Sequence, residues 1–371
     1  MASQTALRDE APPIGILAGG GSLPLEIAAS LKAQGRRVQI VVLEGEADDL
    51  AARPDTIVRN WGQIGGIISA FKSAGCRQIL IVGSVSRPDL TRIKPDLGLF
   101  RALFTVLKLI RAGGDDAVLR GVIAYLAKKG LTVIGPADVA PGLLVKSGPM
   151  PGTKPLDDDN LKLAHRAFEV LTALAPFDVG QALVISQDGV EAIEGAEGTD
   201  HMLTRVAQHR RTKSPAGQQP AYGLLVKQPK AGQDLRVDLP AIGPTTVLGA
   251  VEANLIGLVA EASRVIALSR AALIERALAA DVAVVGVTPK SAGKAGRPRT
   301  DKSSGQNAGT GANADMDFPV FRVENHGRKS FRDIDKEDAV RCAFVSLAME
   351  PYGCGRVVVA SRGHVLAVQA G

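Results

Sequence analysis

A short apolar segment that leads directly into three glycines most restricts how this chain can fold. The apolar segment is Ile14–Ala18, Gly19-Gly20-Gly21 follow it, and a helix-forming stretch begins at Leu23. Glycines let backbone N–H groups approach a phosphate closely, and the start of a helix adds a favourable dipole. The pattern predicts a strand, a turn and a helix. The turn is either a phosphate cradle or a purely structural element.

Apolar strands and helical patterns alternate through the first 145 residues. The predicted strands are Ile14–Ala18, Val38–Leu43, Gln78–Gly83 and Thr132–Gly135, and the predicted helices are Leu23–Gln34, Gln63–Ala74 and Asp115–Lys129. This alternation is typical of right-handed βαβ units in a parallel sheet. Aromatic residues make up only 4% of the chain, so its cores must be aliphatic, as in buried parallel strands. We therefore predict an α/β protein in which residues 1–145 form a Rossmann-like domain.

Changes in composition divide the rest of the chain. Residues 146–155 are rich in Pro and Gly and are expected to link two domains. Residues 156–288 are expected to form a second, mixed α/β domain. Residues 289–315 are basic and poor in apolar side chains, which predicts disorder.

Several local patterns are predicted within the second domain. Its expected strands are Gln181–Ser186, Tyr222–Lys227 and Val282–Val287, and an Arg- and Lys-rich loop is expected at His209–Lys213. Asp157-Asp158-Asp159-Asn160 favours a helix start over a metal cluster, because adjacent carboxylates on a helix point in different directions.

Residues 316–371 resemble a partial copy of the start of the second domain. Arg356–Ser361 parallels Gln181–Ser186, and Val365–Val368 parallels Val190–Ile193. The copied part carries no chemical motif, so we expect a vestigial or edge-covering piece rather than a catalytic one.

Charge and composition exclude several classes of protein. The net charge is +6, but residues 289–313 carry +4 of it, and the chain has one Trp and three Tyr. Positive and negative charges are nearly balanced in the rest of the chain, and few aromatic side chains could stack on bases, which argues against nucleic-acid binding. Three scattered Cys make neither a disulfide framework nor a zinc site, which fits a reduced cytoplasm. No apolar run approaches a membrane span, and the first 13 residues lack the apolar core of an export signal.

The glycine turn departs from the dinucleotide-binding fingerprint. That fingerprint needs a third Gly or Ala where this chain has Pro24. Pro24 weakens the case for an NAD(P)-dependent oxidoreductase, although Glu44 at the end of the second strand could imitate the ribose-binding acid.

Two further motifs of the first domain are candidates for ligand contact. Ser86 and Arg87 follow a buried strand, where open α/β sheets place their ligands, and they suit a diphosphate. Asp115 and Asp116 open a helix. Capping explains one acid, and contact with ribose, base or metal would explain the other, so both interpretations stay open.

The second domain supplies the remaining candidates. Thr199 and Asp200 precede a helix and suit capping as well as binding. Lys227 ends a strand. Arg236 and Asp238 lie in a segment expected to be a short strand, where they would share one face. Such a pair is either a salt bridge or a charge clamp next to a group that binds Mg²⁺ or orients water.

Six motifs, taken in order, closely resemble the LpxI family of UDP-2,3-diacylglucosamine pyrophosphatases, which act in lipid A biosynthesis. They are Leu17-Ala18-Gly19-Gly20-Gly21-Ser22-Leu23-Pro24, Gly83-Ser84-Val85-Ser86-Arg87-Pro88, Gly114-Asp115-Asp116, Asp178-Val179-Gly180-Gln181, Glu197-Gly198-Thr199-Asp200 and Arg236-Val237-Asp238-Leu239-Pro240. The resemblance covers about residues 12–288 and rests on all six motifs together.

The resemblance implies Mg²⁺-dependent hydrolysis of UDP-2,3-diacylglucosamine to UMP and 2,3-diacylglucosamine 1-phosphate, with water attacking the phosphorus nearer the sugar. It also implies two α/β domains with the substrate between them. Asp238 stands at the family's critical aspartate and is the expected metal ligand, and Lys227 and Arg236 are expected beside it in catalysis. The expected substrate-binding residues are Gly19, Gly20, Gly21, Ser22, Ser86, Arg87, Asp115, Asp116, Thr199 and Asp200.

A substrate with two acyl chains implies a cytoplasmic enzyme at the inner face of the inner membrane. The apolar segment Leu97–Ile110 is expected to be a core helix or a contact for acyl chains. The sequence leaves open whether two copies pair as a homodimer. The rival functions are an NAD(P)-dependent oxidoreductase and a non-catalytic UDP-sugar-binding module.

Overall fold

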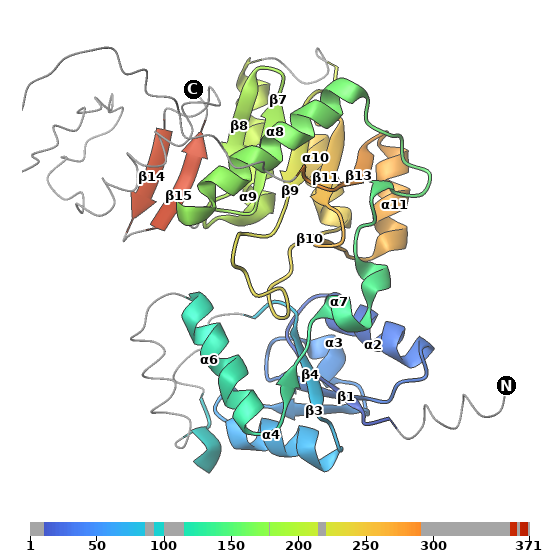
Figure 1. The fold of residues 1–371 in the computed structure, drawn as a ribbon, viewed down its shortest axis with the longest axis vertical. Coiled ribbons are helices and arrows are strands. Elements are labelled where there is room, and N and C mark those ends of the chain that lie inside the picture. Colours follow the sequence, from blue (N-terminus) through green and yellow to red (C-terminus); the bar gives the residue numbers. More distant parts are fainter. Residues whose placement is uncertain are drawn as a thin grey trace, which may run out of the picture.

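The computed structural model describes residues 11–85, 93–99, 115–177, 179–213, 220–290, 357–361 and 364–369. They form two lobes, with the N-terminal domain below and the second domain above in Figure 1. Each lobe is built around its own principal sheet, parallel in the first and mixed in the second. The predicted fold class, a Rossmann-like domain followed by a mixed α/β domain, is confirmed.

The N-terminal domain contains a five-stranded parallel sheet with strand order β3-β2-β1-β4-β5. Its strands are β1 (Ile14–Ala18), β2 (Val38–Leu43), β3 (Thr56–Arg59), β4 (Gln78–Val82) and β5 (Thr132–Val133). Its helices are α2 (Leu23–Ala33), α3 (Asp48–Ala51), α4 (Ile64–Ser73), α6 (Asp115–Lys128) and α7 (Pro136–Val139), followed by the 3-10 turn η2 (Pro141–Leu143). The predicted elements are present with ends within two residues of their expected positions. The short elements β3 and α3 were not predicted.

Aliphatic side chains fill both faces of this sheet, because successive residues of a strand point to opposite sides. Ile14 and Ile16 of β1 are buried on the face that α2 and α3 cover. Val41 of β2 and Ile79 of β4 are buried on the other face, together with Phe71 of α4. The winding therefore changes face between β1 and β4, which are neighbours in the sheet. The crevice outside the carboxyl ends of such a strand pair is where open α/β sheets bind ligands.

The second domain contains an eight-stranded mixed sheet with order β14-β15-β8-β7-β9-β11-β13-β6. Its strands are β6 (Gly148–Pro149), β7 (Ala182–Ser186), β8 (Gly189–Ile193), β9 (Leu224–Lys227), β11 (Gly257–Glu261), β13 (Ala283–Val287), β14 (Val357–Ser361) and β15 (His364–Gln369). A separate parallel pair is formed by β10 (Ala241–Ile242) and β12 (Ile266–Ala267). The helices are α8 (Asp158–Leu174), α9 (Gly198–Lys213), α10 (Pro244–Glu252) and α11 (Arg270–Ala279), with a 3-10 turn η3 (Ala175–Phe177).

Helices cover both faces of the second sheet. Helix α8 packs Phe168 and Leu171 on one face, against buried side chains of β7, β9, β11 and β13. Helices α9, α10 and α11 pack on the other face, where Leu203, Val247 and Leu273 are buried. Figure 1 shows α8 crossing in front of the strands. The predicted helix start before α8 is confirmed, since the Asp157 side chain caps it by accepting a hydrogen bond from Asn160 N at 2.8 Å.

Two local predictions for this domain differ from the structure. Residues His209–Lys213 are not a loop but the last turn of α9, where basic side chains are favoured by the helix dipole. Residues 146–155, expected as a linker, contribute β6, which pairs antiparallel with β13, and Met150 is buried in the core. This segment therefore connects the domains and also completes one edge of the second sheet.

The C-terminal hairpin, formed by β14 and β15, extends the opposite edge of the second sheet by pairing with β8. The predicted disordered linker falls, from residue 291 on, outside the described residues. Among the helices of the described residues, none has the length and hydropathy that crossing a bilayer requires.

Candidate functional site

The two glycine-containing loops at the ends of β1 and β4 pack directly against each other. Gly20 N donates a hydrogen bond to Ser84 O at 2.7 Å, and Ser84 N donates to Gly20 O at 2.9 Å. A Cβ on Gly19 would lie 2.2 Å from Ser84 O, so only glycine fits there. Gly21 has a φ of +89° and open space around it. Gly19 and Gly20 thus have a structural explanation, whereas Gly21 and the adjacent Ser22 are free to face a ligand.

The other N-terminal candidates are placed only in part. Ser86 and Arg87 lie outside the described residues. Asp115 and Asp116 begin α6 as predicted, and the choice between capping and binding stays open for them. Of the predicted helix 97–110, the described part, residues 97–99, is helical, so its contact with acyl chains stays a prediction.

Glu44, the residue that could have bound the ribose of a dinucleotide, forms contacts within its own domain. Its carboxylate accepts a hydrogen bond from Asn60 Nδ2 at 2.8 Å and lies 3.2 Å from Lys94 Nζ. The bond from Asn60, followed by the contact with Lys94, lowers the pKa of Glu44. Glu44, the residue that could imitate the ribose-binding acid, is thus paired with two residues of its own domain.

A pocket of about 810 Å³ lies where the second domain meets the glycine loop of the first. Ser22 lines it from the N-terminal domain, and three predicted residues, Thr199, Asp200 and Lys227, line it from the second. The full set of lining residues is Ser22, Glu197, Gly198, Thr199, Asp200, His201, Lys227, Ala241, Ile242, Gly243, Pro244, Thr245, Thr246, Leu248, Leu268, Ser269 and Arg276. The structure therefore brings candidates from both domains to one cavity.

Two helices begin at this pocket. Helix α9 starts at Gly198, whose φ of +81° suits glycine, and α10 starts at Pro244, which fills a position that has no N–H partner inside a helix. The unpaired N–H groups and the dipole make each helix start favourable for an anion. The lining residues Gly243 to Thr246 were missed from the sequence, although a Gly-Pro step before an apolar helical pattern is a recognisable helix start.

Lys227 is the buried cation of this pocket. Its side chain lies at the end of β9 and is only 7% exposed, and its Nζ donates a hydrogen bond to Thr199 Oγ1 at 2.8 Å. Burial lowers the pKa of Lys227, and the charges of Glu194, Asp200 and Asp238 oppose that shift. An ammonium has three donors. This arrangement suits a cation that receives a phosphate oxygen in place of water.

Glu194, which follows β8, is the residue that sequence analysis missed. Thr199 Oγ1 donates to Glu194 Oε1 at 2.8 Å, so the hydroxyl links this buried carboxylate to Lys227. The other carboxylate oxygen accepts from Gln181 N at 2.9 Å. An acid directly after an apolar strand was a usable signal, but it lies outside the six motifs.

The part of the motif Asp178-Val179-Gly180-Gln181 that the structure describes, residues 179–181, is explained by this carboxylate. Gly180 N donates to Glu194 O at 2.9 Å, and a Cβ on Gly180 would lie 2.1 Å from that oxygen. The backbone must come this close for Gln181 N to reach the side chain of Glu194. Two separated motifs of the second domain therefore meet around Glu194, through residues 179–181 of the first and Thr199 of the second.

Arg236 and Asp238 lie in the loop between β9 and β10, and the prediction of a strand there is wrong. Val237 N and Asp238 N both donate to Asp234 O at 3.1 Å, which closes a turn. Arg236 pairs with Asp234, with its Nη2 2.6 Å from Oδ2, rather than with Asp238. The carboxylate of Asp238 accepts a hydrogen bond from Gln233 Nε2. Asp238 is exposed, yet its charge acts on Lys227.

This loop reaches across to the N-terminal domain, as Figure 1 shows for the yellow segment between β9 and β10. Val237 packs against the core face that α4 and α6 cover. A Cβ on Gly135 would lie 3.2 Å from the Cα of Arg236, so the two segments are in close contact. Asp238 is therefore held next to the interface of the domains, on the side of the first-domain sheet where its strands end.

The Mg²⁺ ion expected from the sequence would need acidic ligands near Lys227. Within the described residues, no group of three or more His, Cys, Asp or Glu is placed to hold an ion. Mg²⁺ is commonly bound by one or two carboxylates together with substrate phosphates, however. Asp200, which lines the pocket, fits such a partial site, whereas Asp238 is not among the lining residues, although its charge also acts on Lys227.

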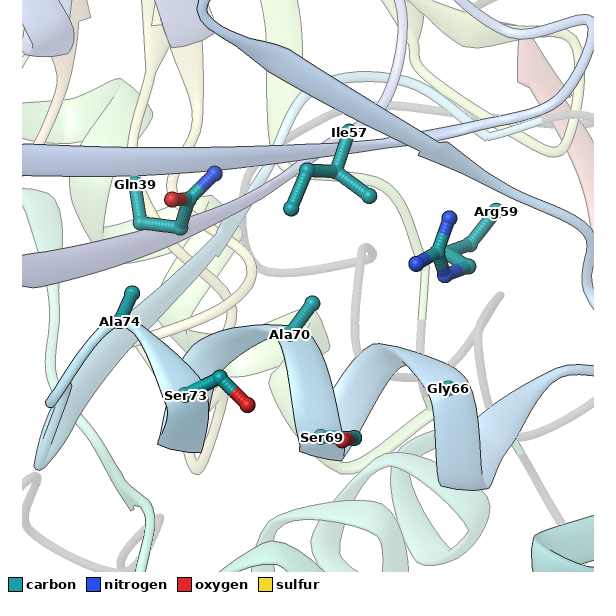
Figure 2. A pocket seen from close by; sticks show the side chains of 8 residues that line it. All are labelled: Gln39, Ile57, Arg59, Gly66, Ser69, Ala70, Ser73 and Ala74. Atoms are coloured by element: carbon teal, nitrogen blue, oxygen red, sulfur yellow. The ribbon is translucent and has the colours of Figure 1, made fainter.

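A second pocket, of about 460 Å³, lies on the N-terminal domain between α4 and the strands β2 and β3 (Figure 2). Small side chains of α4 form one wall, and Arg59 is its one charged lining residue. The Nη1 of Arg59 donates to Val58 O at 2.9 Å. None of the predicted site residues that the structure describes lines this pocket, and its described lining contains no Asp, Glu or His that could act as a general acid or base.

Comparison with known proteins agrees with this two-domain arrangement. Residues 13–143 match the LpxI N-terminal domain, and residues 146–285 match the LpxI C-terminal domain. A protein of Caulobacter vibrioides, named UDP-2,3-diacylglucosamine pyrophosphatase LpxI, is 34% identical over 277 residues, which are 75% of this chain and 98% of that protein. Both domain matches and a relative that aligns over nearly its whole length lead to one conclusion: this chain belongs to the LpxI family.

Proposed function

We propose that this chain hydrolyses the pyrophosphate bond of UDP-2,3-diacylglucosamine, giving UMP and 2,3-diacylglucosamine 1-phosphate. The observation that carries the proposal is the buried Lys227 in a pocket where α9 and α10 begin. A diphosphate needs such a concentration of positive potential. The activity in the name of the Caulobacter relative supports the same substrate.

In this proposal, the second domain binds the charged centre of the substrate. Lys227 and the N–H groups at the starts of α9 and α10 neutralise the phosphate oxygens as negative charge develops on them. Thr199 accepts a hydrogen bond from Lys227 and donates one to Glu194, so it sets the direction of the ammonium. Gly21 and Ser22 meet the nucleotide side of the diphosphate from the first domain.

Asp238 is proposed as the residue that acts on the attacking water. Its carboxylate is exposed, oriented by Gln233, and close enough to Lys227 to act on its charge. Asp238 and Asp200 would hold a Mg²⁺ ion, which when bound supplies charge neutralisation to the phosphates. Arg236 is paired with Asp234, so we propose for it a role in shaping the turn and not in contacting substrate.

The direct test is incubation of the full chain with UDP-2,3-diacylglucosamine in the presence of Mg²⁺ or EDTA. We expect release of UMP with Mg²⁺ and much less with EDTA. The absence of UMP under both conditions, with intact folding by circular dichroism, would contradict the proposed function. Reduction or oxidation of an added nicotinamide cofactor would favour the oxidoreductase.

The phosphorus that water attacks can be assigned by isotope. Hydrolysis in ¹⁸O-labelled water should place the label in 2,3-diacylglucosamine 1-phosphate and leave UMP unlabelled, because attack occurs at the phosphorus nearer the sugar. Label in UMP would show the opposite direction of attack while leaving the pyrophosphatase activity itself established.

A substrate with two acyl chains also requires contact with a membrane, so we propose that the enzyme works at the inner face of the inner membrane. Residues 289–313 carry a net charge of +4, and each cation near an anionic surface contributes about 1 kcal/mol at most. We expect co-sedimentation with anionic vesicles that weakens when these cations are replaced by Gln. Equal vesicle binding by the unaltered protein and the Gln variant would rule out this role for residues 289–313.

A further inference from the structure

The edge strand β8 of the second sheet is covered by the C-terminal hairpin. Val368 pairs with Ile193 and Gln369 pairs with Ala192, both in antiparallel register. In Figure 1 the two red strands continue the sheet beyond β8. An uncovered edge would present unpaired N–H and C=O groups, which are a template for pairing with another chain.

The hairpin that covers the edge repeats the hairpin it covers. In β7–β8, Val184 pairs with Ala192, and the register shifts between Val184 and Ile185. In β14–β15, Val359 pairs with Ala367, and the register shifts between Val359 and Ala360. These are equivalent positions in the sequence parallel between Arg356–Ser361 and Gln181–Ser186. The likeness thus extends from the residues to the irregularity of the pairing.

The contact between the two hairpins also has a symmetry. Val368 occupies in the copy the place that Ile193 occupies in the original, and these two residues are cross-strand partners. When equivalent residues of two antiparallel strands pair with each other, a local two-fold axis passes between them. A two-fold contact of the same surface with itself is the geometry of a symmetric homodimer.

We propose that the C-terminal hairpin occupies, within one chain, the position that the β7–β8 hairpin of a second copy of this chain would take, and thereby keeps the protein monomeric. The interaction surface is the edge of β8 that β15 covers, and its alternative partner is another copy of the same chain. β15 is the repeat of β8, so it offers β8 the same backbone groups that β8 of a second chain would offer. The C-terminal hairpin and a second chain therefore compete for the same edge. This inference does not depend on the proposed activity.

Disulfide trapping tests the placement of the hairpin in the full chain. In a background with Cys342→Ser and Cys354→Ser, we expect Ile193→Cys with Val368→Cys to form a disulfide within one chain, since directly opposite residues of antiparallel strands are close enough. The matched control is Ile193→Cys with Val358→Cys, one strand farther out, which should not cross-link. A 193–368 disulfide that joins two chains, or none at all, would overturn the proposal.

Disruption of the hairpin tests its competition with a second copy. Leu366→Pro with Val368→Pro removes two backbone N–H groups from β15. By light scattering we expect the full chain to be a monomer and this variant to be a dimer. When Ile193→Cys is added to the proline variant, we expect a disulfide between residue 193 of one chain and residue 193 of the other. Leu366→Ala with Val368→Ala keeps the N–H groups and should stay monomeric. A dimeric unaltered chain, or a proline variant that stays monomeric, would overturn the proposal.

Discussion

The ammonium group of Lys227 lies where removal of water disfavours a charge most strongly, and three acids offset part of that effect. Glu194 is buried and fixed by Thr199 and Gln181 N, whereas Asp238 is exposed. Because desolvation is the largest influence, the pKa of Lys227 stays below its ordinary value. The residue therefore loses its proton at a lower pH than an exposed lysine does.

Replacement of Glu194 by Gln should move the alkaline limit of activity to lower pH. Glu194 raises the pKa of Lys227, so loss of its charge lowers that pKa further, and the cation that binds phosphate disappears earlier as pH rises. The measurement is kcat/KM against pH, which reports the free enzyme. Glu197→Gln is the matched control, because Glu197 lines the same pocket but pairs with Arg205. An unchanged alkaline limit in Glu194→Gln would show that loss of the Lys227 proton does not set the alkaline limit of activity.

Replacement of Asp238 by Ala should remove turnover while leaving the fold intact. The residue is exposed in a loop turn, so its loss creates no cavity. If it acts on the attacking water, kcat should fall by about 10²-fold or more, with a small change in KM. Asp55→Asn, an exposed acid paired with Lys32, serves as the control. Near-normal kcat in Asp238→Ala would exclude the catalytic role.

At the scale of elements, long apolar strands were predictable and tightly folded loops were not. Strands such as β1 and β4 are buried on both sides, so their sequences are continuous apolar runs. Residues 234–238 alternate in polarity like a strand, but the backbone of Asp234 closes a turn and its carboxylate pairs with Arg236. The end of α9 was mistaken for a loop because its basic residues mask the helical pattern.

The candidate site was predictable where its residues belong to the motifs recognised in the sequence. Lys227, Thr199 and Asp200 do meet in one pocket. Glu194 directly follows an apolar strand, but its role arises from Gln181 and Thr199, which approach it from other parts of the fold, and the sequence does not show that they meet.

Gly180→Ala should destabilise the second domain. The new Cβ would lie 2.1 Å from Glu194 O and would push apart the segments that hold Glu194. We expect a loss of about 1–3 kcal/mol in the free energy of unfolding, as for overpacked sites. Gly142→Ala, at a position with open space, is the control in urea denaturation. Equal stability of the two variants would show that the backbone at Gly180 can relax freely.

At the scale of the whole molecule, contacts across the domains place the two halves of the pocket. The carboxylate of Glu26 in α2 accepts hydrogen bonds from Ser269 N at 3.0 and 3.1 Å, at the start of α11. Arg270 Nη2 donates to Leu144 O at 2.7 Å. The loop that carries Asp238 packs on the first domain through Val237. The site therefore depends on the relative position of the domains.

Glu26→Ala should loosen this arrangement. A hydrogen bond to a charged group contributes about 1.5–3 kcal/mol, so the domains should separate more often and KM should rise. Small-angle scattering should show a larger radius of gyration than for the control Glu275→Ala, an exposed acid of α11. Identical scattering and KM in both variants would show that this contact does not set the domain position.

The covered edge of β8 has a consequence for how the protein behaves at different concentrations. A covalently attached copy of a binding element is present at an effective concentration on the order of millimolar, whatever the amount of protein in solution. A free second chain at micromolar concentration, offering the same backbone groups, would be outcompeted by about a thousandfold. Duplication of one hairpin would thus make the assembly state of this chain independent of its expression level.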